Sequence, residues 1–456
     1  MLQRRQKILI IYKYLDYPLR TTIDEHLYSF LRYANATCYY LKLNHKKDTY
    51  YKGDTIPDYL LKIDFDIILF HYAFLSSRYA GKESFLTSLN QVLPLKNSKA
   101  IKAVLPQDEY FDSESLVHFI HELNIQIVFS VSPETEWGQL YEGVDFTKIK
   151  FYKVLTGYLD DKGIKTIDRF SKSIKKDIDV GYRARNLPQW LGRHGYMKTE
   201  IAEIFNATLK KYNLNTSIST NPKDTFLGYD WYRFMVRCKY MLGVEGGSTV
   251  HDRDGSITIK GKAYLKEHPN CTFEEIENAC FAGLDGKLQL IAISPRHLEA
   301  CATKTCQLLV ESTYNGILKP GVHYIEIKKD FSNVNEVLDL VKNDSLRHEI
   351  VENAYRDIVL SGKYSYPNFV NFVLEKCNLE TEASVNAKQE TKTINKYKYN
   401  RYKDWISWRI DFYFHLKDKV SDKWFYIEPT VKLIKYLRLN KPLKIGYQII
   451  TGKKSA

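Results

Sequence analysis

Several features are missing from this sequence, and each absence excludes a class of protein. No segment approaches the roughly 20 consecutive apolar residues of a membrane-spanning helix. The apolar run behind the basic N-terminal residues is too short for a secretory signal peptide. The seven cysteines form no CxxC pair, so we expect no zinc site and no disulfide framework, in keeping with a reducing cytoplasm. Walker, GxSxG and HExxH motifs are also absent.

Excess charge of one sign is also missing from most of the chain. The 456 residues carry a formal net charge of +13, but residues 388–456 hold 17 Lys or Arg and only 6 Asp or Glu. That segment accounts for +11, which leaves about +2 for the preceding residues. The body therefore lacks the broad positive field that is typical of nucleic-acid-binding domains.

The N-terminal third alternates short apolar runs with segments of helical length. Strands are predicted at 7–12, 36–43, 66–70, 101–105, 125–131 and 151–155, and helices at 22–33, 83–92 and 113–123. This alternation indicates a parallel sheet covered by helices on both faces. We assign residues 1–165 to a first, Rossmann-like domain.

A second alternating series follows the polar, lysine-rich stretch Asp168–Lys176. Strands are predicted at 178–182, 215–219, 240–244, 288–293 and 307–310, and helices at 199–212, 230–238, 333–342 and 345–360. Residues 170–375 are therefore predicted to form a second Rossmann-like domain. Two such domains in series predict an α/β fold with a ligand cleft at the facing ends of the strands.

The C-terminal residues differ in composition from both domains. Residues 380–396 are polar and are predicted to be a linker, and residues 397–456 mix aromatic side chains with Lys and Arg in a basic helical tail. Such a mixture favours the surface of an anionic membrane, with each cation contributing about 1 kcal/mol. A helical tail that packs back onto the body is the plainer alternative. Binding of nucleic acid through the tail is a non-enzymatic alternative, against which the nearly neutral body argues.

A basic cluster follows the first strand of the second domain. It contains Arg183, Arg185, Arg193 and Lys198, with glycines at 181 and 192 that allow close approach of the backbone. Arginine binds phosphate oxygens in a bidentate fork and lysine adds a point charge. The cluster suits a diphosphate, although a solvated basic face is an equal alternative on spacing alone.

A second motif follows the strand predicted at 288–293. Ser294 suits an N-cap, Pro295 suits the first helical position, and Glu299 falls within the first turns. A helix N-terminus favours anions, and a carboxylate close by can accept hydrogen bonds from ribose hydroxyls. Ordinary helix capping explains the motif equally well.

A third motif surrounds Glu245. Gly246, Gly247 and Ser248 follow it and predict an open loop at the edge of the cleft. Asp252 and Asp254 come next and could indicate a metal, but Gly255 directly after them favours a turn.

The second motif and the residues that follow it resemble a known family. Ser294-Pro295-Arg296, Glu299-Ala300, Gln307–Glu311 and the stretch from Tyr314 through Gly316 to Lys319-Pro320 resemble the donor-site region of group 1-like GT-B glycosyltransferases. The resemblance covers about 170–375 and is closest to members with a spore-maturation-type C-terminal domain, found in bacterial surface-polysaccharide biosynthesis. It implies that Glu299 binds the nucleotide ribose and that Arg183, Arg193 and Lys198 face the diphosphate.

The sequence departs from the family at one position. Retaining members commonly carry a glutamate about seven residues before the ribose glutamate, where this chain has Ile291-Ala292-Ile293. Glu245 is the candidate for that general role, and the stereochemistry stays open. An inverting route needs a general base, for which Asp16, His71 and Asp108 are candidates because they follow predicted strands of the first domain.

The resulting hypothesis is a cytoplasmic, metal-independent glycosyltransferase without a cofactor. It would move a sugar from a nucleotide donor to a glycan or lipid-linked acceptor of lipopolysaccharide or capsule, in contact with the inner face of the membrane. A GT-B-fold nucleotide-sugar epimerase is the enzymatic alternative. The predicted donor-binding residues are Arg183, Arg185, Arg193, Lys198, Gly246, Gly247, Ser248, Arg296, Glu299, Tyr314 and Lys319.

Overall fold

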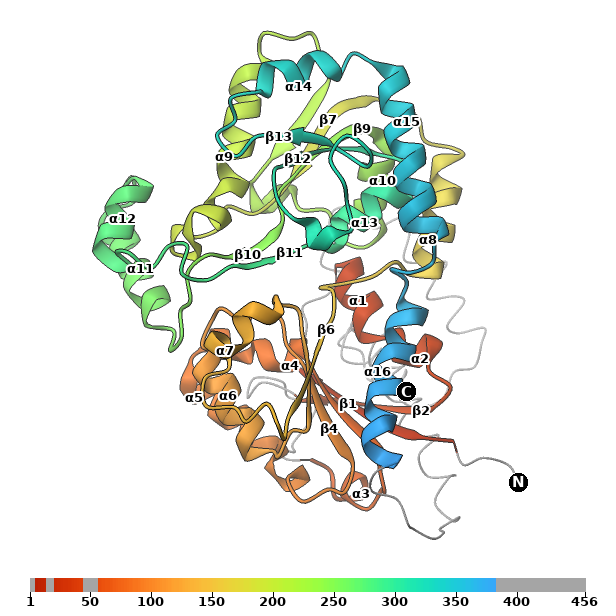
Figure 1. Cartoon of the computed structure of the whole chain (residues 1–456), viewed down its shortest axis with the longest axis vertical. Coiled ribbons are helices and arrows are strands. Elements are labelled where there is room, and N and C mark those ends of the chain that lie inside the picture. Colours follow the sequence, from red (N-terminus) through yellow and green to blue (C-terminus); the bar gives the residue numbers. More distant parts are fainter. Residues whose placement is uncertain (1–4, 14–19, 44–55, 383–456) are drawn as a thin grey trace, which may run out of the picture. The chain divides into compact units, whose positions relative to one another are not determined.

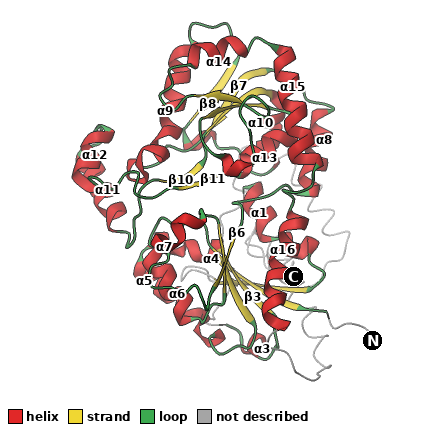
Figure 2. Cartoon of the chain, viewed as in Figure 1, coloured by secondary structure: helices red, strands yellow, loops and turns green. Residues whose placement is uncertain are grey.

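The structure is a computed structural model that describes residues 5–13, 20–43 and 56–382 (Figure 1). In these residues helices and strands alternate along the chain (Figure 2), and the strands form two separate parallel sheets. The predicted α/β class with two Rossmann-like sheets is therefore confirmed. The predicted tail at 397–456 and Asp16 lie outside the described residues.

The first sheet has six parallel strands in the order β2-β1-β3-β4-β5-β6. The order turns back at β1, because β2 pairs on one side of it and β3 on the other. Ligands of open α/β sheets bind at such a switch point, beyond the carboxyl ends of the strands. The strands are β1 (Lys7–Lys13), β2 (Thr37–Leu43), β3 (Ile67–His71), β4 (Ile101–Leu105), β5 (Ile127–Ser130) and β6 (Lys150–Lys153).

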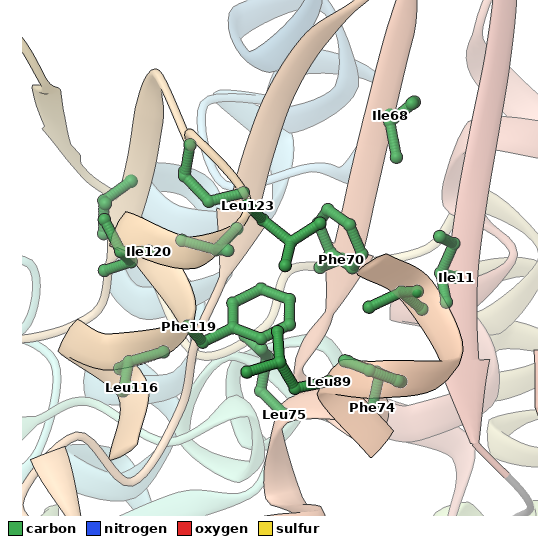
Figure 3. Close-up of a cluster of buried hydrophobic side chains, with 14 of the residues drawn as sticks. Ile11, Ile68, Phe70, Phe74, Leu75, Leu89, Leu116, Phe119, Ile120 and Leu123 are labelled. Carbon is green, nitrogen blue, oxygen red and sulfur yellow. The ribbon is translucent and has the colours of Figure 1, made fainter. Parts of the chain in front are cut away.

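Alternate residues of these strands point to opposite faces, and each face has its own core. Ile11, Ile68 and Phe70 join one cluster with Phe119 of a covering helix (Figure 3). The ring of Phe119 lies 5.0 Å from that of Phe70, an edge-to-face contact that adds to the burial of both rings. The helices of the first domain are α1 (Thr21–Leu27), α2 (Ser29–Tyr33), α3 (Asp58–Leu61), α4 (Tyr72–Leu75), α5 (Lys82–Val92), α6 (Ser113–Glu122) and α7 (Trp137–Leu140).

The second sheet has five parallel strands in the order β13-β12-β9-β7-β8. Its switch point lies between β7 and β9, so the loops that begin at residues 184 and 244 meet at one place. The strands are β7 (Ile178–Arg183), β8 (Thr216–Ser219), β9 (Cys238–Gly243), β12 (Cys306–Val310) and β13 (Ile325–Ile327). The helices are α8 (Asp161–Ser171), α9 (Gly192–Leu209), α10 (Tyr229–Arg237), α13 (Pro295–Ala302), α14 (Val334–Leu340) and α15 (Asp344–Ala354).

The segment at 288–293 was predicted to be a strand of the parallel sheet, and this prediction was wrong. Its central part forms β11 (Leu290–Ala292), which pairs antiparallel with β10 (Gly246–Ser248) in a separate two-stranded ribbon. Helices α11 (Ser256–Glu267) and α12 (Phe273–Cys280) lie between these strands in the sequence. The ribbon therefore joins the Glu245 loop directly to the start of α13.

The last described helix, α16 (Tyr366–Glu382), packs on the first sheet although 366–375 was assigned to the second domain. Tyr366, Phe369 and Val373 are fully or almost fully buried there. The helix also continues to residue 382, into the segment predicted as a linker. The chain thus passes between the sheets twice. Backbone hydrogen bonds join the two connections: the Leu159 amide donates to the Tyr364 carbonyl at 2.8 Å, and the Tyr366 amide donates to the Leu159 carbonyl at 2.9 Å. Among the described helices, none has the length and apolarity needed to cross a bilayer.

Candidate functional site

Helix α13 begins where β11 ends, and its first turns hold the Ser294–Glu299 motif. Pro295 occupies the first helical position as predicted. Ser294 is the N-cap residue, but its hydroxyl makes no capping hydrogen bond and is buried with no partner among the described residues. The amides at this end are therefore not satisfied by a capping side chain. Arg296, in the first turn, donates to the carbonyl of Arg183 at the end of β7, so this helix start lies at the carboxyl end of the second sheet, where anions are expected.

Glu299 is buried, and only one of its two carboxylate oxygens is used. Its Oε2 accepts a hydrogen bond of 2.8 Å from the indole Nε1 of Trp231 on α10. Its Oε1 is buried and has no partner in the described part of the chain. Burial raises the pKa of Glu299 to about 7, against the opposing effects of the Trp231 hydrogen bond and the charge of Arg296. The group is held in one orientation with one free acceptor atom.

Glu245 follows β9 and is also fully buried. Neither of its carboxylate oxygens makes a hydrogen bond of ordinary geometry with the described residues. Burial raises its pKa, while the Ser312 hydroxyl, the Tyr314 amide and the charges of Lys153 and Lys198 act in the opposite direction. A buried carboxylate without firm partners is costly unless a ligand supplies donors.

Lys198 connects these groups. It lies near the start of α9, and burial, together with the charge of Arg296, lowers its pKa to about 8, whereas Asp108 and Glu245 raise it. Its ammonium also lies beside Gly246 of the ribbon. Asp108 follows β4 in the first domain, is exposed to solvent and has a left-handed backbone with φ of 52°. The structure thus brings Lys198, Arg296, Glu245 and Asp108 of the predicted site together.

The Asp108 loop is held in place by Arg78, a side chain that the sequence did not single out. Arg78 is fully buried, and its guanidinium donates to the carbonyl oxygens of Leu75, Gln107, Phe111 and Asp112. Four carbonyl acceptors around one guanidinium fix the path of the loop. The structure therefore makes Arg78 the anchor from which Asp108 projects.

Of the other predicted cations, Arg185 joins this group and Arg183 does not. Arg185 is exposed in the loop after β7, and its charge acts on Arg20 of the first domain, as does that of Arg296. Arg183 is turned toward β8, where it donates to the Ser217 carbonyl and hydroxyl and lies over the rings of Phe226 and Phe234. Its contribution is its backbone carbonyl, which accepts a hydrogen bond of 2.8 Å from Arg296.

Three more predicted donor-binding residues make contacts elsewhere, and a fourth is exposed to solvent. Arg193 pairs with Glu274 at 2.8 Å and lies over the ring of Phe273. Tyr314 is fully buried, and its hydroxyl donates to the Val310 carbonyl. The Ser248 hydroxyl lies within hydrogen-bond distance of the Leu191 and Val250 carbonyls, and Lys319 is exposed to solvent. The side chains of Arg193, Tyr314 and Ser248 are thus engaged in contacts of their own within the second domain.

His71 is engaged at both ring nitrogens. Its Nδ1 accepts from the Ala73 amide at 3.1 Å as the N-cap of α4, and its Nε2 lies 2.9 Å from Nδ1 of His26. Burial, and then the neighbouring His26, lowers the pKa of His71 well below its ordinary value. These contacts suit a structural histidine more than a free base.

Asp252 and Asp254 are turn and cap residues, as the sequence favoured. Asp252 accepts from the amides of Ile257 and Thr258 at 3.0 and 2.8 Å, and Asp254 accepts from the Ser256 amide at 3.0 Å. Within the described ranges, no group of three or more His, Cys, Asp or Glu side chains is placed to hold a metal ion.

Two residues of α10 that sequence reasoning missed bind carboxylates of both domains. Trp231 donates to Glu299, and the neighbouring Tyr232 hydroxyl donates at 2.8 Å to Glu25 of α1. Glu25 is buried, and burial followed by the charge of Glu299 raises its pKa well above the ordinary value. The only signal in the sequence was an aromatic pair at the start of a helix, and 207 positions separate Glu25 from Tyr232.

Comparisons with known proteins found similar solved structures but no matching family. No protein-family model and no curated protein matches the chain. Solved structures similar to it include the DNA-modifying β-glucosyltransferase, at 16% identity and a TM-score of 0.46 over 82% of this chain and 100% of that one. HepE of Anabaena in complex with UDP and glucose is similar at 10% identity and a TM-score of 0.44, over 82% and 100%. TarM of S. aureus is similar at 15% identity and a TM-score of 0.42, over 70% of this chain and 57% of that one. The chain thus spans little more than half of TarM, and likeness at this level carries no argument about donor or acceptor.

Proposed function

We propose that this chain is a glycosyltransferase that moves a sugar from a nucleoside-diphosphate donor to an acceptor hydroxyl. The observation that carries the proposal is the carboxylate of Glu299 in the first turns of α13. One oxygen is fixed by Trp231 at 2.8 Å, and the other is buried without a partner in the described chain. A free, oriented acceptor atom beside an uncapped helix start suits a ribose hydroxyl next to a phosphate.

The charges around α13 support a diphosphate in the same place. Arg296, Arg185 and Lys198 contribute cations, and Arg296 is held by the Arg183 carbonyl at 2.8 Å. Fixed positive groups that face the leaving oxygen stabilise the charge that develops as the glycosidic bond to phosphate breaks. We propose that these groups supply this stabilisation without a metal.

The reaction also needs a group that receives the proton of the acceptor hydroxyl. The acceptor oxygen bonds to the anomeric carbon, the electron pair of the broken bond passes to the diphosphate, and the proton goes to a base. We propose Asp108 for an inverting route, because it projects from the first domain and its charge interacts with that of Lys198. Although the residue is partly open to solvent, the surrounding protein removes hydration from its carboxylate and so raises its pKa. A base with a raised pKa accepts a proton more readily at neutral pH. Glu245 is then proposed to lie at the transferred sugar.

The acceptor and the place of action are proposed from the sequence. The resemblance to surface-polysaccharide enzymes supports a glycan of lipopolysaccharide or capsule as the acceptor. The aromatic and basic composition of 397–456 supports contact with an anionic membrane surface. Both proposals are finer than the donor assignment and are tested separately from it.

The donor assignment is tested by binding of nucleotides to the Glu299→Gln variant. Calorimetry with UDP, GDP and ADP first identifies the base, and the matching 2′-deoxynucleotide removes one ribose hydroxyl. We expect Glu299→Gln to weaken the ribonucleotide about tenfold or more, because a charge-assisted hydrogen bond is lost. The native chain should bind the deoxynucleotide more weakly than the ribonucleotide. Glu299→Gln should bind the two nucleotides with equal affinity.

Glu349→Gln is the matched control, because Glu349 is exposed on α15. It should leave all affinities unchanged. Equal deoxy penalties in the native chain and in Glu299→Gln would show that Glu299 does not bind the ribose. If no nucleoside diphosphate binds the native chain, the proposed function itself is wrong.

A further inference from the structure

Two helices of different domains are held next to the same pair of α10 residues. Tyr232 binds Glu25 of α1, and Trp231 binds Glu299 of α13, each at 2.8 Å. Both carboxylates are buried, at 6% and 3% exposure, and each lies within one or two turns of its helix's first residue. The beginnings of α1 and α13 are therefore close to one another.

An arginine stands at each of these helix beginnings. Arg20 directly precedes α1, and its carbonyl accepts the amides of Ile23 and Asp24 at 3.0 and 3.2 Å. Arg296 is the second residue of α13, and Arg185 follows the neighbouring strand β7. Lost hydration, and then the charges of Arg185 and Arg296, lower the pKa of Arg20. Arg296 also donates to the carbonyl of Arg183 at 2.8 Å, only two residues before Arg185. The hydrogen bonds of α10 and this contact therefore place three guanidinium-bearing residues from two domains near one another.

These three groups have no carboxylate partner in the described part of the chain. The ion pairs that arginines form among the described residues all involve arginines other than these three, such as Arg193 with Glu274 and Arg237 with Asp177. Three like charges that act on one another repel, and an anion that binds among them relieves the repulsion. The arrangement therefore calls for a ligand with more than one negative charge.

We propose that Arg20 is a third guanidinium of the diphosphate site, supplied by the first domain, and that it binds the released nucleoside diphosphate more strongly than the intact donor. This inference rests on the proposed function. The inference adds to the proposed function a residue that distinguishes the released diphosphate from the intact donor by its charge.

The charge of the ligand explains the preference. In the donor both phosphates are esterified and together carry about two negative charges. In the released diphosphate the terminal phosphate has a further ionisation near pH 6, so that the total at neutral pH is about three. Arg185 and Arg296 neutralise the two negative charges of the donor. Arg20 neutralises the additional negative charge that develops as the bond breaks. An interaction that strengthens along the reaction raises kcat rather than donor affinity.

The test compares binding of UDP and UDP-glucose, or of the equivalent pair for the base that binds, to Arg20→Gln. Arg20 precedes the first turn of α1 and keeps part of its surface in solvent, so the variant is expected to fold. We expect UDP to lose about tenfold or more in affinity, and UDP-glucose threefold or less. In turnover assays, kcat should fall while the donor KM changes little. Arg185→Gln should weaken both ligands alike, and Arg193→Gln, outside the group, should change neither.

Equal losses of UDP and UDP-glucose in Arg20→Gln would overturn the inference, since Arg20 would then bind a part common to both. Unchanged affinity for both ligands would overturn it as well. Arg20→Lys should restore part of the preference for UDP, because it keeps the charge without the fork. Failure of the native chain to bind either ligand would instead count against the proposed function.

Discussion

At the scale of single residues, the pKa of Lys198 predicts how the affinity for the nucleoside diphosphate depends on pH. Burial, and then the charge of Arg296, lowers its pKa to about 8, so a growing fraction is neutral above that pH. The neutral amine no longer attracts phosphate. We therefore expect the affinity for the nucleoside diphosphate to fall several-fold between pH 7 and 9. Calorimetric titration at pH 7, 8 and 9 measures this directly.

Lys198→Arg is the matched variant, because arginine stays charged over this range. Its affinity should be level from pH 7 to 9. If the affinity of the native chain falls between pH 7 and 9 by no more than that of Lys198→Arg, Lys198 does not contact the phosphates. Below pH 7 a second decline is expected, since Glu299, with a pKa of about 7, becomes protonated and loses its negative charge.

The chemical type of the site residues could be predicted from the sequence, but their orientation could not. The motif around Pro295 correctly located the helix start, with Glu299 in its first turns, whereas the burial of Glu299 could not be foreseen. Arg183 and Arg185 were equivalent by spacing, yet the rings of Phe226 and Phe234 draw Arg183 away. Arg20, Glu25 and Tyr232 were missed because their relation depends on contacts between distant parts of the chain.

At the scale of elements, the ribbon of β10 and β11 depends on one glycine. Gly247 has φ of 125°, and a Cβ there would lie 1.8 Å from the Leu290 carbonyl oxygen across the ribbon. Gly247→Ala therefore forces the two strands apart. We expect a loss of about 2–4 kcal/mol in the free energy of unfolding, and weaker nucleotide binding, because Glu245 and α13 flank the ribbon.

Urea denaturation of Gly247→Ala and Gly316→Ala separates the clash from the backbone strain. Gly316 has φ of 68°, but a Cβ there meets no atom within 4 Å. Gly316→Ala should cost only the strain of a left-handed residue, about 1 kcal/mol, and leave binding intact. Equal losses in the two variants would mean that the ribbon accommodates the methyl group.

The strands of both parallel sheets were predictable because their buried runs are short and separated by helical segments. The ribbon was not, since the apolar run at 288–293 has the same pattern whichever partner it takes. Helix α9 begins at Gly192, seven residues before the predicted start. Two glycines in its first turn concealed it, because glycine is a poor helix former.

At the scale of the whole molecule, α16 predicts where the chain can be shortened. Its buried side chains, Tyr366, Phe369, Val370, Val373 and Cys377, complete one face of the first sheet. A chain that ends after residue 390 keeps them and should retain the stability of the full chain. A chain that ends after residue 365 loses them, at about 2–5 kcal/mol for each large side chain, which exceeds typical domain stability in sum.

Circular dichroism melting and nucleotide binding distinguish the two truncations. The longer one should melt and bind like the full chain, and it should no longer sediment with phosphatidylserine vesicles if 397–456 contacts membranes. A stable first domain in the chain ending at 365 would show that α16 is dispensable. Unchanged sedimentation of the chain ending at 390 would contradict the membrane proposal alone.

The paired connections at Leu159 and Tyr366 limit how the domains can move. The two passages of the chain are joined by backbone hydrogen bonds on either side of Leu159, so they bend as one hinge. Rotation about that hinge leaves these bonds intact, whereas sliding or separation of the domains breaks them. Backbone hydrogen bonds between Asp252 and both Tyr110 and Asp112 form a further link between the domains. Rotation about the hinge must therefore break that link or carry the segment around Asp252 along with the first domain.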